Sequence, residues 1–239
     1  MMGMPARMRG VTLVEMAIVL LILGVLARAV VAPLSAVQAH RQHRDAVSQL
    51  ETIRNAMWAH VVSRGVLPCP IIMDGMMTTG SRTACNHYAG GVPAAALGLP
   101  GPVDGEGALL DPWNRPYRLA ISRPGVDRQD SGEPFDWTVE GEASRVGIRQ
   151  LTADIVVCKQ SVSGHCPSKS VRADALSFVV FSLGADDSSA GEQAENLDAD
   201  QVFVVEEHSV RAEAPFDDLL LWGTAAETIY WMLRAGWLP

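Results

Sequence analysis

The four cysteines of this sequence could in principle bind zinc, act in redox chemistry or form disulfides, and their spacing decides among these roles. Cys69, Cys85, Cys158 and Cys166 form two sequence-local pairs, and no spacing is the C-x-x-C of a zinc or redox site. An even number of cysteines in an exported chain predicts two disulfides, with free thiols as the alternative. Of the three possible connectivities we prefer Cys69–Cys85 with Cys158–Cys166, because each bond closes one short loop.

No arrangement of residues indicates catalysis. The sequence lacks the G-x-S-x-G, H-E-x-x-H, Walker and G-x-G-x-x-G motifs. His40 and His43 lie three residues apart on a predicted helix. Such a pair could bind a metal ion, but it more commonly belongs to the solvent-exposed polar face of the helix. Cys166 follows His165, but adjacent side chains rarely point at one another, and Cys158 is the better partner. We therefore expect a protein that is not an enzyme.

Composition and charge narrow the class of protein further. The 239 residues suffice for one domain and an anchor, and 48% hydrophobic with 6% aromatic residues excludes a disordered chain and a polytopic membrane protein. The net charge is −8, with most of the acidic residues in the C-terminal half. Because nucleic-acid binding needs a basic surface, this negative net charge argues against a nucleic-acid-binding protein.

Glu15 is the titratable residue in the most unusual place, at the start of an apolar run. The 22 residues of Met16–Val37 contain a single charge, Arg28, and about 20 apolar helical residues span a bilayer core. Arg7 and Arg9 ahead of the run favour a cytoplasmic N-terminus and an exported C-terminal part. A carboxylate at membrane depth is costly and implies a partner.

The segment from Arg9 to Met16, RGVTLVEM, resembles the processing site of type IV pilins and pseudopilins. The resemblance implies that a prepilin peptidase cuts after Gly10, that Val11 becomes the N-methylated first residue, and that Glu15 matches the family's acidic fifth residue. The Glu15 carboxylate can then pair with the α-ammonium of an adjacent subunit in an apolar filament core. A secretory signal peptide, whose best site Ala27-Arg28-Ala29 is poor, and an uncleaved anchor are the alternatives.

Behind this junction the sequence predicts one long helix and then strands. The helix runs from about residue 12 to residue 64, and its second half is amphipathic because apolar residues recur at steps of three and four: Val47, Leu50, Ile53, Met57 and Val61. The strand candidates are Tyr117–Ser122, Phe135–Glu140, Asp154–Cys158, Leu176–Leu183, Val202–Glu206 and Asp218–Trp222, and Thr224–Ala235 is a candidate final helix. Strands that follow one long helix predict an α+β fold, pilin-like, with an antiparallel sheet packed on the helix.

The domain organisation follows from the junction and the helix. Residues 1–10 are expected to be a leader that prepilin peptidase removes. Residues 11–39 form a transmembrane helix that becomes the filament core. Residues 40–239 form the periplasmic or extracellular head.

Three motifs of the head extend the resemblance to major pseudopilins of type II secretion. DPWNRPY at residues 111–117 is similar to their DPWGxPY segment, with Asn114 where glycine is usual, and Asn is the next best residue for positive φ. SLGADD at residues 182–187 is similar to the start of their calcium loop, and DDLLLW at residues 217–222 is similar to the element that closes it.

The resemblance implies that Ca²⁺ is held by the Leu183 carbonyl, Asp186, and Asp217 or Asp218. Calcium takes six to eight oxygen ligands in flexible geometry, and a loop rich in carboxylates can supply them. About thirty residues separate the two halves of the motif here. The carboxylates of this insert either replace missing ligands or belong to a solvated acidic loop.

The sequence thus predicts a structural subunit, a pseudopilin or minor pilin of a type II secretion pseudopilus or a type IV pilus. Its partners would be like subunits, prepilin peptidase and an inner-membrane assembly platform, with nucleic acid expected only in a DNA-uptake role. It would cross the bacterial inner membrane once, with the N-terminus cytoplasmic and the head periplasmic, and join a filament on assembly. The alternatives are a single-pass, membrane-anchored periplasmic protein with calcium-dependent binding, and a tethered enzyme.

Overall fold

The computed structural model describes residues 12–72, 85–123, 135–185, 191–198, 200–206 and 216–239. The chain divides into two compact units, Met1–His43 and Arg44–Pro239. Helix α1 (Leu13–Arg64) contributes to both units, and every other helix and strand of the described residues belongs to the second unit, the head.

Thr12 fixes the start of α1. Its Oγ1 accepts a hydrogen bond from the backbone N–H of Glu15 at 3.2 Å, and its carbonyl accepts one from the N–H of Met16 at 3.1 Å. Thr-x-x-Glu is the sequence of a capping box, in which the first side chain satisfies a donor that the helix itself leaves unpaired. The helix therefore begins within the same short segment that resembles a processing site.

The second half of α1 buries one stripe of side chains against the head. The stripe consists of residues that are at most 1% exposed: Ala46, Leu50, Ile53, Met57 and Val61. The predicted stripe was wrong at its first member, because Val47 is 36% exposed. A step of four from Ala46 to Leu50 keeps one side of the helix inward, whereas Val47 is rotated by about 100° from Ala46. The hydroxyl of Tyr117 donates to the Ala46 carbonyl at 3.4 Å, so the small residue stands where the sheet approaches.

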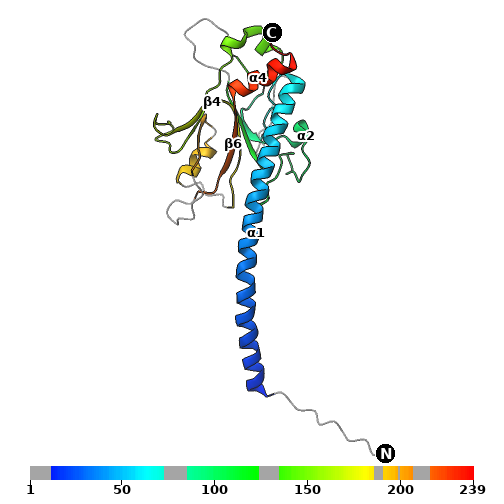
Figure 1. Cartoon of the computed structure of the whole chain (residues 1–239), viewed down its shortest axis with the longest axis vertical. Coiled ribbons are helices and arrows are strands. Elements are labelled where there is room, and N and C mark those ends of the chain that lie inside the picture. The colour runs from blue at the N-terminus through cyan, green and yellow to red at the C-terminus, as the bar shows by residue number, and fades with distance from the viewer. Residues whose placement is uncertain (1–11, 73–84, 124–134, 186–190, 199, 207–215) are drawn as a thin grey trace, which may run out of the picture. The chain divides into compact units, whose positions relative to one another are not determined.

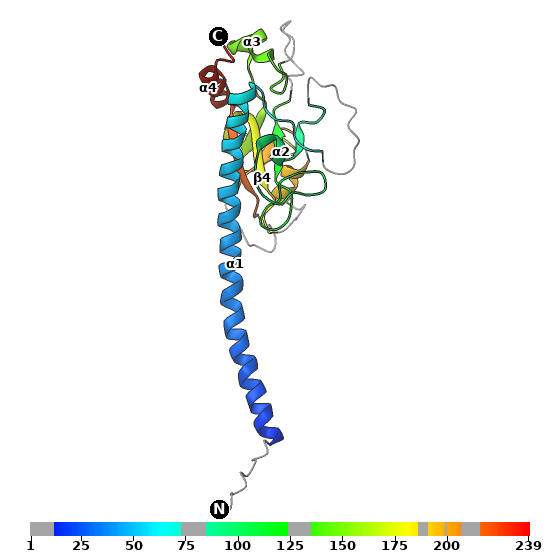
Figure 2. The same cartoon turned by 90° about the vertical axis from the view of Figure 1, so that its right-hand side faces the viewer.

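The head is built on one six-stranded sheet. Its strands are β1 (Ala89–Gly91), β2 (Arg118–Ile121), β3 (Ile155–Cys158), β4 (Val171–Ser182), β5 (Val202–Val204) and β6 (Leu219–Thr224). The order is β1-β2-β4-β3-β5, with β6 paired to β4. The expected antiparallel sheet is mixed, because β5 returns after the 3₁₀ helix η2 (Gly191–Leu197) and pairs in parallel with β3. Figures 1 and 2 show the second half of α1 along one face of this sheet.

Strand β4 separates two apolar clusters because its side chains alternate between the two faces. Phe178 and Val180 belong to the cluster that includes the α1 stripe, whereas Val179 and Phe181 belong to the cluster on the opposite face. The short helices α2 (Ala94–Leu97), α3 (Glu142–Val146) and η1 (Ile148–Gln150) lie in the connections.

Helix α4 (Ala225–Ala235) closes the head and lies beside the end of α1 in both views (Figures 1 and 2). It begins with a reciprocal capping box between Thr224 and Glu227. Beyond α4, the indole N–H of Trp237 donates to the Val62 carbonyl at 2.9 Å, so the C-terminal segment caps one of the last carbonyls of α1.

The predicted strand at 135–140 is wrong, and Asp136 explains why. Phe135 and Trp137 are buried, as are Asp136 and Thr138 between and after them, but the segment forms turns. Asp136 Oδ1 accepts hydrogen bonds from both the backbone N–H and the hydroxyl of Thr138. An Asp side chain that bonds its own backbone two residues on favours a turn over a strand.

Candidate functional site

The processing residues Gly10 and Val11 lie outside the described residues, and Glu15 lies in the first turn of α1. Glu15 is exposed, and its backbone N–H is held by Thr12 at 3.2 Å. The cap leaves the Glu15 carboxylate on the helix surface, where a charge from another molecule can reach it.

The first half of α1 presents apolar side chains outward on all sides. Eleven large apolar residues between Leu13 and Leu26 are 43–87% exposed. Among the described residues, none of the helices combines the length and the apolar character that crossing a bilayer requires. The transmembrane half of the predicted helix therefore stays a prediction.

In the head, the structure brings the three resembling motifs together around Asp111. This carboxylate is 3% exposed, and its Oδ1 accepts the backbone N–H groups of Trp113 and Arg115, both at 2.9 Å. Its Oδ2 accepts the hydroxyl of Ser182 at 2.6 Å, and Ser182 Oγ in turn accepts the N–H of Gly184 at 3.2 Å. The buried carboxylate thus ties the first motif to the second.

Two backbone conformations at this junction explain residue choices in the motifs. Asn114 has φ 62°, the positive value expected where related segments use glycine. Gly184 has φ 66°, and a Cβ at this position would lie 2.3 Å from the Asp217 carbonyl oxygen. Only glycine lets the second motif approach the third this closely.

Three of the implied calcium ligands, Leu183, Asp217 and Asp218, have hydrogen-bond partners within the described residues. The Leu183 carbonyl accepts a hydrogen bond from the guanidinium of Arg115 at 3.2 Å, which places a positive charge beside this carbonyl. Asp217 Oδ2 accepts the N–H of Ala185, and Asp218 Oδ2 accepts the Asn196 side-chain amide at 2.7 Å. Asp186 lies outside the described residues.

Asn196 gives Asp218 a structural role. Its amide also donates to the Val204 carbonyl at 3.0 Å and accepts the Val204 N–H at 2.7 Å, so it mimics a neighbouring strand for β5. Asn196 and Asp218 are 2% and 5% exposed. Buried polar groups with complete hydrogen bonding stabilise one arrangement of the chain, here that of η2, β5 and the start of β6.

Three carboxylates of the acidic insert lie close together, those of Glu195, Asp198 and Asp200, with one oxygen of each within 4.8 Å of the others. Burial, and after it the negative charge of Asp198, raises the pKa of Asp200. Asp200 Oδ1 also accepts the Val202 N–H at 2.6 Å, which orders the entry into β5. Calcium binding stays a prediction of the resemblance.

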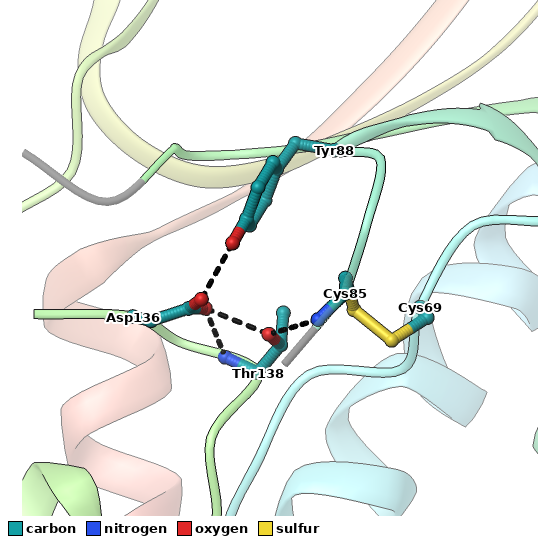
Figure 3. The surroundings of a disulfide bond; sticks show 5 residues. All are labelled: Cys69, Cys85, Tyr88, Asp136 and Thr138. Carbon is teal, nitrogen blue, oxygen red and sulfur yellow. Dashed lines mark hydrogen bonds between the residues drawn. A yellow bond between two sulfur atoms is a disulfide. The ribbon is translucent and has the colours of Figure 1, made fainter. Parts of the chain in front are cut away.

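The structure joins Cys69 to Cys85 and Cys158 to Cys166, the pairs that close short loops. Figure 3 shows the polar network beside the first bond. The N–H of Cys85 donates to Thr138 Oγ1 at 3.1 Å, and the Tyr88 hydroxyl donates to Asp136 Oδ2 at 2.5 Å. Burial, reinforced by the hydrogen bond to Asp136, raises the pKa of Tyr88. The network fastens the disulfide segment to the turn that replaces the predicted strand.

Comparison with known families gives one match, at the N-terminus. Residues 5–27 match the prokaryotic N-terminal methylation motif. No curated protein and no solved structure matches the chain. The match therefore concerns the processing segment and the first half of α1, and the arrangement of the head stands on the structure alone.

The motif and the structure together define the class. The N-terminal motif supports a type IV pilin-like precursor, of the family that includes the pseudopilins, and the structure has an α+β fold. This motif marks a structural subunit and not an enzyme. It implies processing by a prepilin peptidase and assembly with other pilin subunits.

Sequence reasoning assigned no role to Asp111, Arg115 or Ser182, which join the first motif to the second. One feature of the sequence could have indicated the role of Asp111. An Asp in a turn-rich segment, here just before Pro and Trp, commonly accepts hydrogen bonds from the backbone N–H groups that follow it. The contacts made by Arg115 and Ser182 span 68 and 71 residues of sequence, and no local pattern predicts them.

Proposed function

We propose that this chain is a pseudopilin or minor pilin that assembles, after cleavage between Gly10 and Val11, into the filament of a type II secretion or type IV pilus machine. Before assembly, the first half of α1 holds the subunit in the bacterial inner membrane, with the head on the periplasmic side. An assembly platform in the same membrane then adds it to the filament.

The observation that supports this proposal most is the exposed apolar surface directly behind the processing motif. The eleven side chains between Leu13 and Leu26 find no cover within the described chain. Burial of one large apolar side chain is worth about 1.5–3 kcal/mol, so this surface strongly favours a lipid or protein environment. Apolar helices of like subunits, bundled in a filament core, supply that environment.

Glu15 supplies the specificity of this packing. Inside an apolar bundle a lone carboxylate is strongly unfavourable, and it becomes acceptable when an opposite charge pairs with it. Cleavage after Gly10 creates such a charge, the α-ammonium of Val11, and methylation leaves it positive. A carboxylate of one subunit and the ammonium of the next would then set the axial register between neighbours.

A Glu15→Ala variant tests the charge pair. The precursor should still be cleaved, but its incorporation into filaments should fall by about tenfold or more, because the ammonium of the neighbour is left unpaired in the core. Glu51→Ala is the matched control, since Glu51 is an exposed carboxylate on the head half of the same helix. Quantitative blotting of sheared filaments and membranes measures both. Normal incorporation of the Glu15→Ala variant would contradict the proposed pairing.

The three head motifs favour type II secretion within this proposal. They come together around Asp111 and Gly184, as they must if they form one structural unit similar to that of the major pseudopilins. The two disulfides and the large head favour a minor type IV pilin instead. Deleting the gene and assaying protein secretion and twitching or DNA uptake in the same strain separates the two machines.

Calcium-dependent binding by an anchored head is the second candidate, and the carboxylates of Glu195, Asp198 and Asp200 are what favours it. The Arg115 guanidinium on the Leu183 carbonyl opposes a cation at the position that the resemblance implies. We expect the thermal unfolding midpoint of the protein to be equal in millimolar calcium and in chelator. A midpoint that rises with calcium, and that loses this rise in Asp200→Asn, would place a cation among the three carboxylates.

A further inference from the structure

One segment of this acidic protein has the opposite charge. Residues 155–173 contain no Asp or Glu, and they hold Arg172 together with both lysines of the chain, Lys159 and Lys169. Without these three cations the formal net charge would be −11 instead of −8. We call residues 158–172, from the last residue of β3 to the second residue of β4, the basic hairpin.

The three cations of the basic hairpin point to solvent. All three are exposed, and none of their side chains makes a hydrogen bond or an ion pair with another residue in the described parts of the chain. Val162 and Val171, which are 58% and 38% exposed, add apolar surface between them. Exposed cations interleaved with apolar side chains form a surface that suits an acidic protein partner.

The backbone of the basic hairpin is already ordered for docking. The Cys158–Cys166 disulfide closes its first part, and Ser170 joins the two strands by accepting the Gln160 N–H at 2.7 Å and donating to the Gln160 carbonyl at 2.6 Å. Val162 and His165 exchange backbone hydrogen bonds across the turn. A rigid surface loses little conformational entropy on binding, and this lowers the cost of association.

A concave site lies at the base of the basic hairpin. Lys159 and Arg172 line a cavity of about 300 Å³ together with Val205 and Glu206. The sheet register places Val157 opposite Ala173 and Cys158 opposite Val171, so Arg172 is the extra residue of a β-bulge. Bulges re-aim side chains, and here the bulge brings Arg172 to the same cavity as Lys159. Two cations and one carboxylate line the cavity, so its net charge is positive and a partner's carboxylate can neutralise it.

We propose that the basic hairpin docks onto the acidic surface of a second copy of this chain. The next stretch of sequence, residues 174–218, holds twelve carboxylates and one arginine. Among them, the structure places Asp174, Asp198 and Glu206 at the surface, so each copy carries both the basic hairpin and exposed carboxylates that can complement it. A contact between different surfaces of two copies is heterologous, and repeated contacts of this kind build open helical filaments.

This inference rests on the proposed filament function, but it concerns a contact of the heads and not of α1. Head contacts of exposed charges are individually weak. These contacts between heads would select the rotation and rise between neighbouring subunits and would disfavour wrong registers. The apolar helices would provide most of the free energy of association.

The two lysines make the proposal directly testable. A carbodiimide joins an amine to a carboxylate that it touches, with the loss of water as the carbodiimide becomes a urea. In this chain the only amines are those of Lys159, Lys169 and the N-terminus. An equal mixture of ¹⁵N-labelled and unlabelled full-length chain, in detergent or in filaments, is treated with carbodiimide, and cross-linked peptides are identified by mass spectrometry.

The proposal predicts mixed-isotope peptides that join Lys159 or Lys169 to a carboxylate. Arg172→Glu keeps both amines and should lower their yield by about tenfold, as expected when two or three exposed charge pairs are disturbed. Arg149→Glu, a reversal at another exposed arginine of the head, is the matched control and should leave the yield unchanged. The double variant Lys159→Arg/Lys169→Arg keeps both positive charges but removes both lysine amines. It should lose the cross-link and still enter filaments.

Several results would overturn the inference. These are coupling within single chains only, coupling through the N-terminal amine only, or a yield that Arg172→Glu does not change. Protection of the lysines from acylation by duplex DNA, without mixed-isotope peptides, would assign the surface to nucleic acid instead. Filament incorporation without these cross-links contradicts this inference alone, whereas cross-links in a chain that never enters filaments contradict the proposed function alone.

Discussion

The two halves of α1 are both helical, but their apolar side chains are buried in one half and exposed in the other. Between residues 44 and 64, the stripe from Ala46 to Val61 is at most 1% exposed, and its partners are strands of the same chain. Between Leu13 and Leu26, large apolar side chains are 43–87% exposed. The comparison shows that the head half finds its apolar partners inside the molecule, whereas the N-terminal half requires them from outside.

This difference separates folding from assembly along one helix. Mutations in the head half should change the free energy of unfolding of the head and affect assembly only through it. Mutations in the N-terminal half should leave that free energy unchanged and act on membrane retention and filament incorporation. Ile53→Ala and Gly184→Ala test this separation.

The largest effect on stability is expected from Ile53→Ala. Ile53 is 0% exposed in the core beneath the sheet, and its truncation leaves a cavity, so the head should lose about 2–5 kcal/mol of unfolding free energy. Leu20→Ala, at a side chain that is 64% exposed, should leave the thermal unfolding of the head unchanged. Denaturation of the full-length chain in detergent, followed by tryptophan fluorescence, measures both variants. Equal destabilisation by the two substitutions would break the comparison.

A smaller loss is expected from Gly184→Ala. The new Cβ would meet the carbonyl and the carboxylate of Asp217, and φ 66° is strained for any L side chain, so about 1–3 kcal/mol should be lost. Gly105→Ala is the control, since a Cβ there has no atom within 4 Å. Because the junction lies wholly in the head, filament incorporation should fall only in proportion to the folded fraction. A variant that is fully stable but fails to assemble would contradict the separation.

The smallest effect is expected from Tyr88→Phe, which removes the hydroxyl that donates to Asp136 and should cost about 1 kcal/mol at neutral pH. Burial raises the pKa of Tyr88 in the folded chain above its usual value. A raised folded pKa means that this contribution to stability is complete below the unfolded pKa of about 10 and is lost as the pH rises through the folded pKa. The difference between wild type and variant should therefore shrink above pH 10. A difference that grows with pH would contradict the assigned hydrogen bond.

Much of this architecture could be predicted from the sequence where the pattern is local. The 3.6-residue period of the helix and the continuous apolar run of β4 each depend on neighbours within a few residues. The segment around Trp137 was predicted as a strand, yet the carboxylate of Asp136 accepts the backbone N–H of Thr138 and turns the chain. The parallel β3–β5 pair depends on Asn196, whose amide completes β5 from outside the sheet.

The candidate sites divide in the same way. The motif around Gly10 and Glu15 is contiguous, and for this reason the sequence alone identified it and the family match agrees. The head motifs were also visible, but their meaning depends on Arg115, which reaches the Leu183 carbonyl across 68 residues. A resemblance in sequence shows that the same residue types occur in the same order. It does not show that the Arg115 guanidinium packs against the Leu183 carbonyl, because that contact depends on the folded structure.

The N-terminus of the mature protein tests the central claim most directly. The full chain is expressed with a prepilin peptidase, purified from membranes, and its N-terminal peptide is measured by mass spectrometry. A processed pilin-like subunit should begin at Val11 with a methylated α-amine. A chain that retains Met1, or one cut within Ala27–Ala29 as a secretory signal peptide would be, would contradict it.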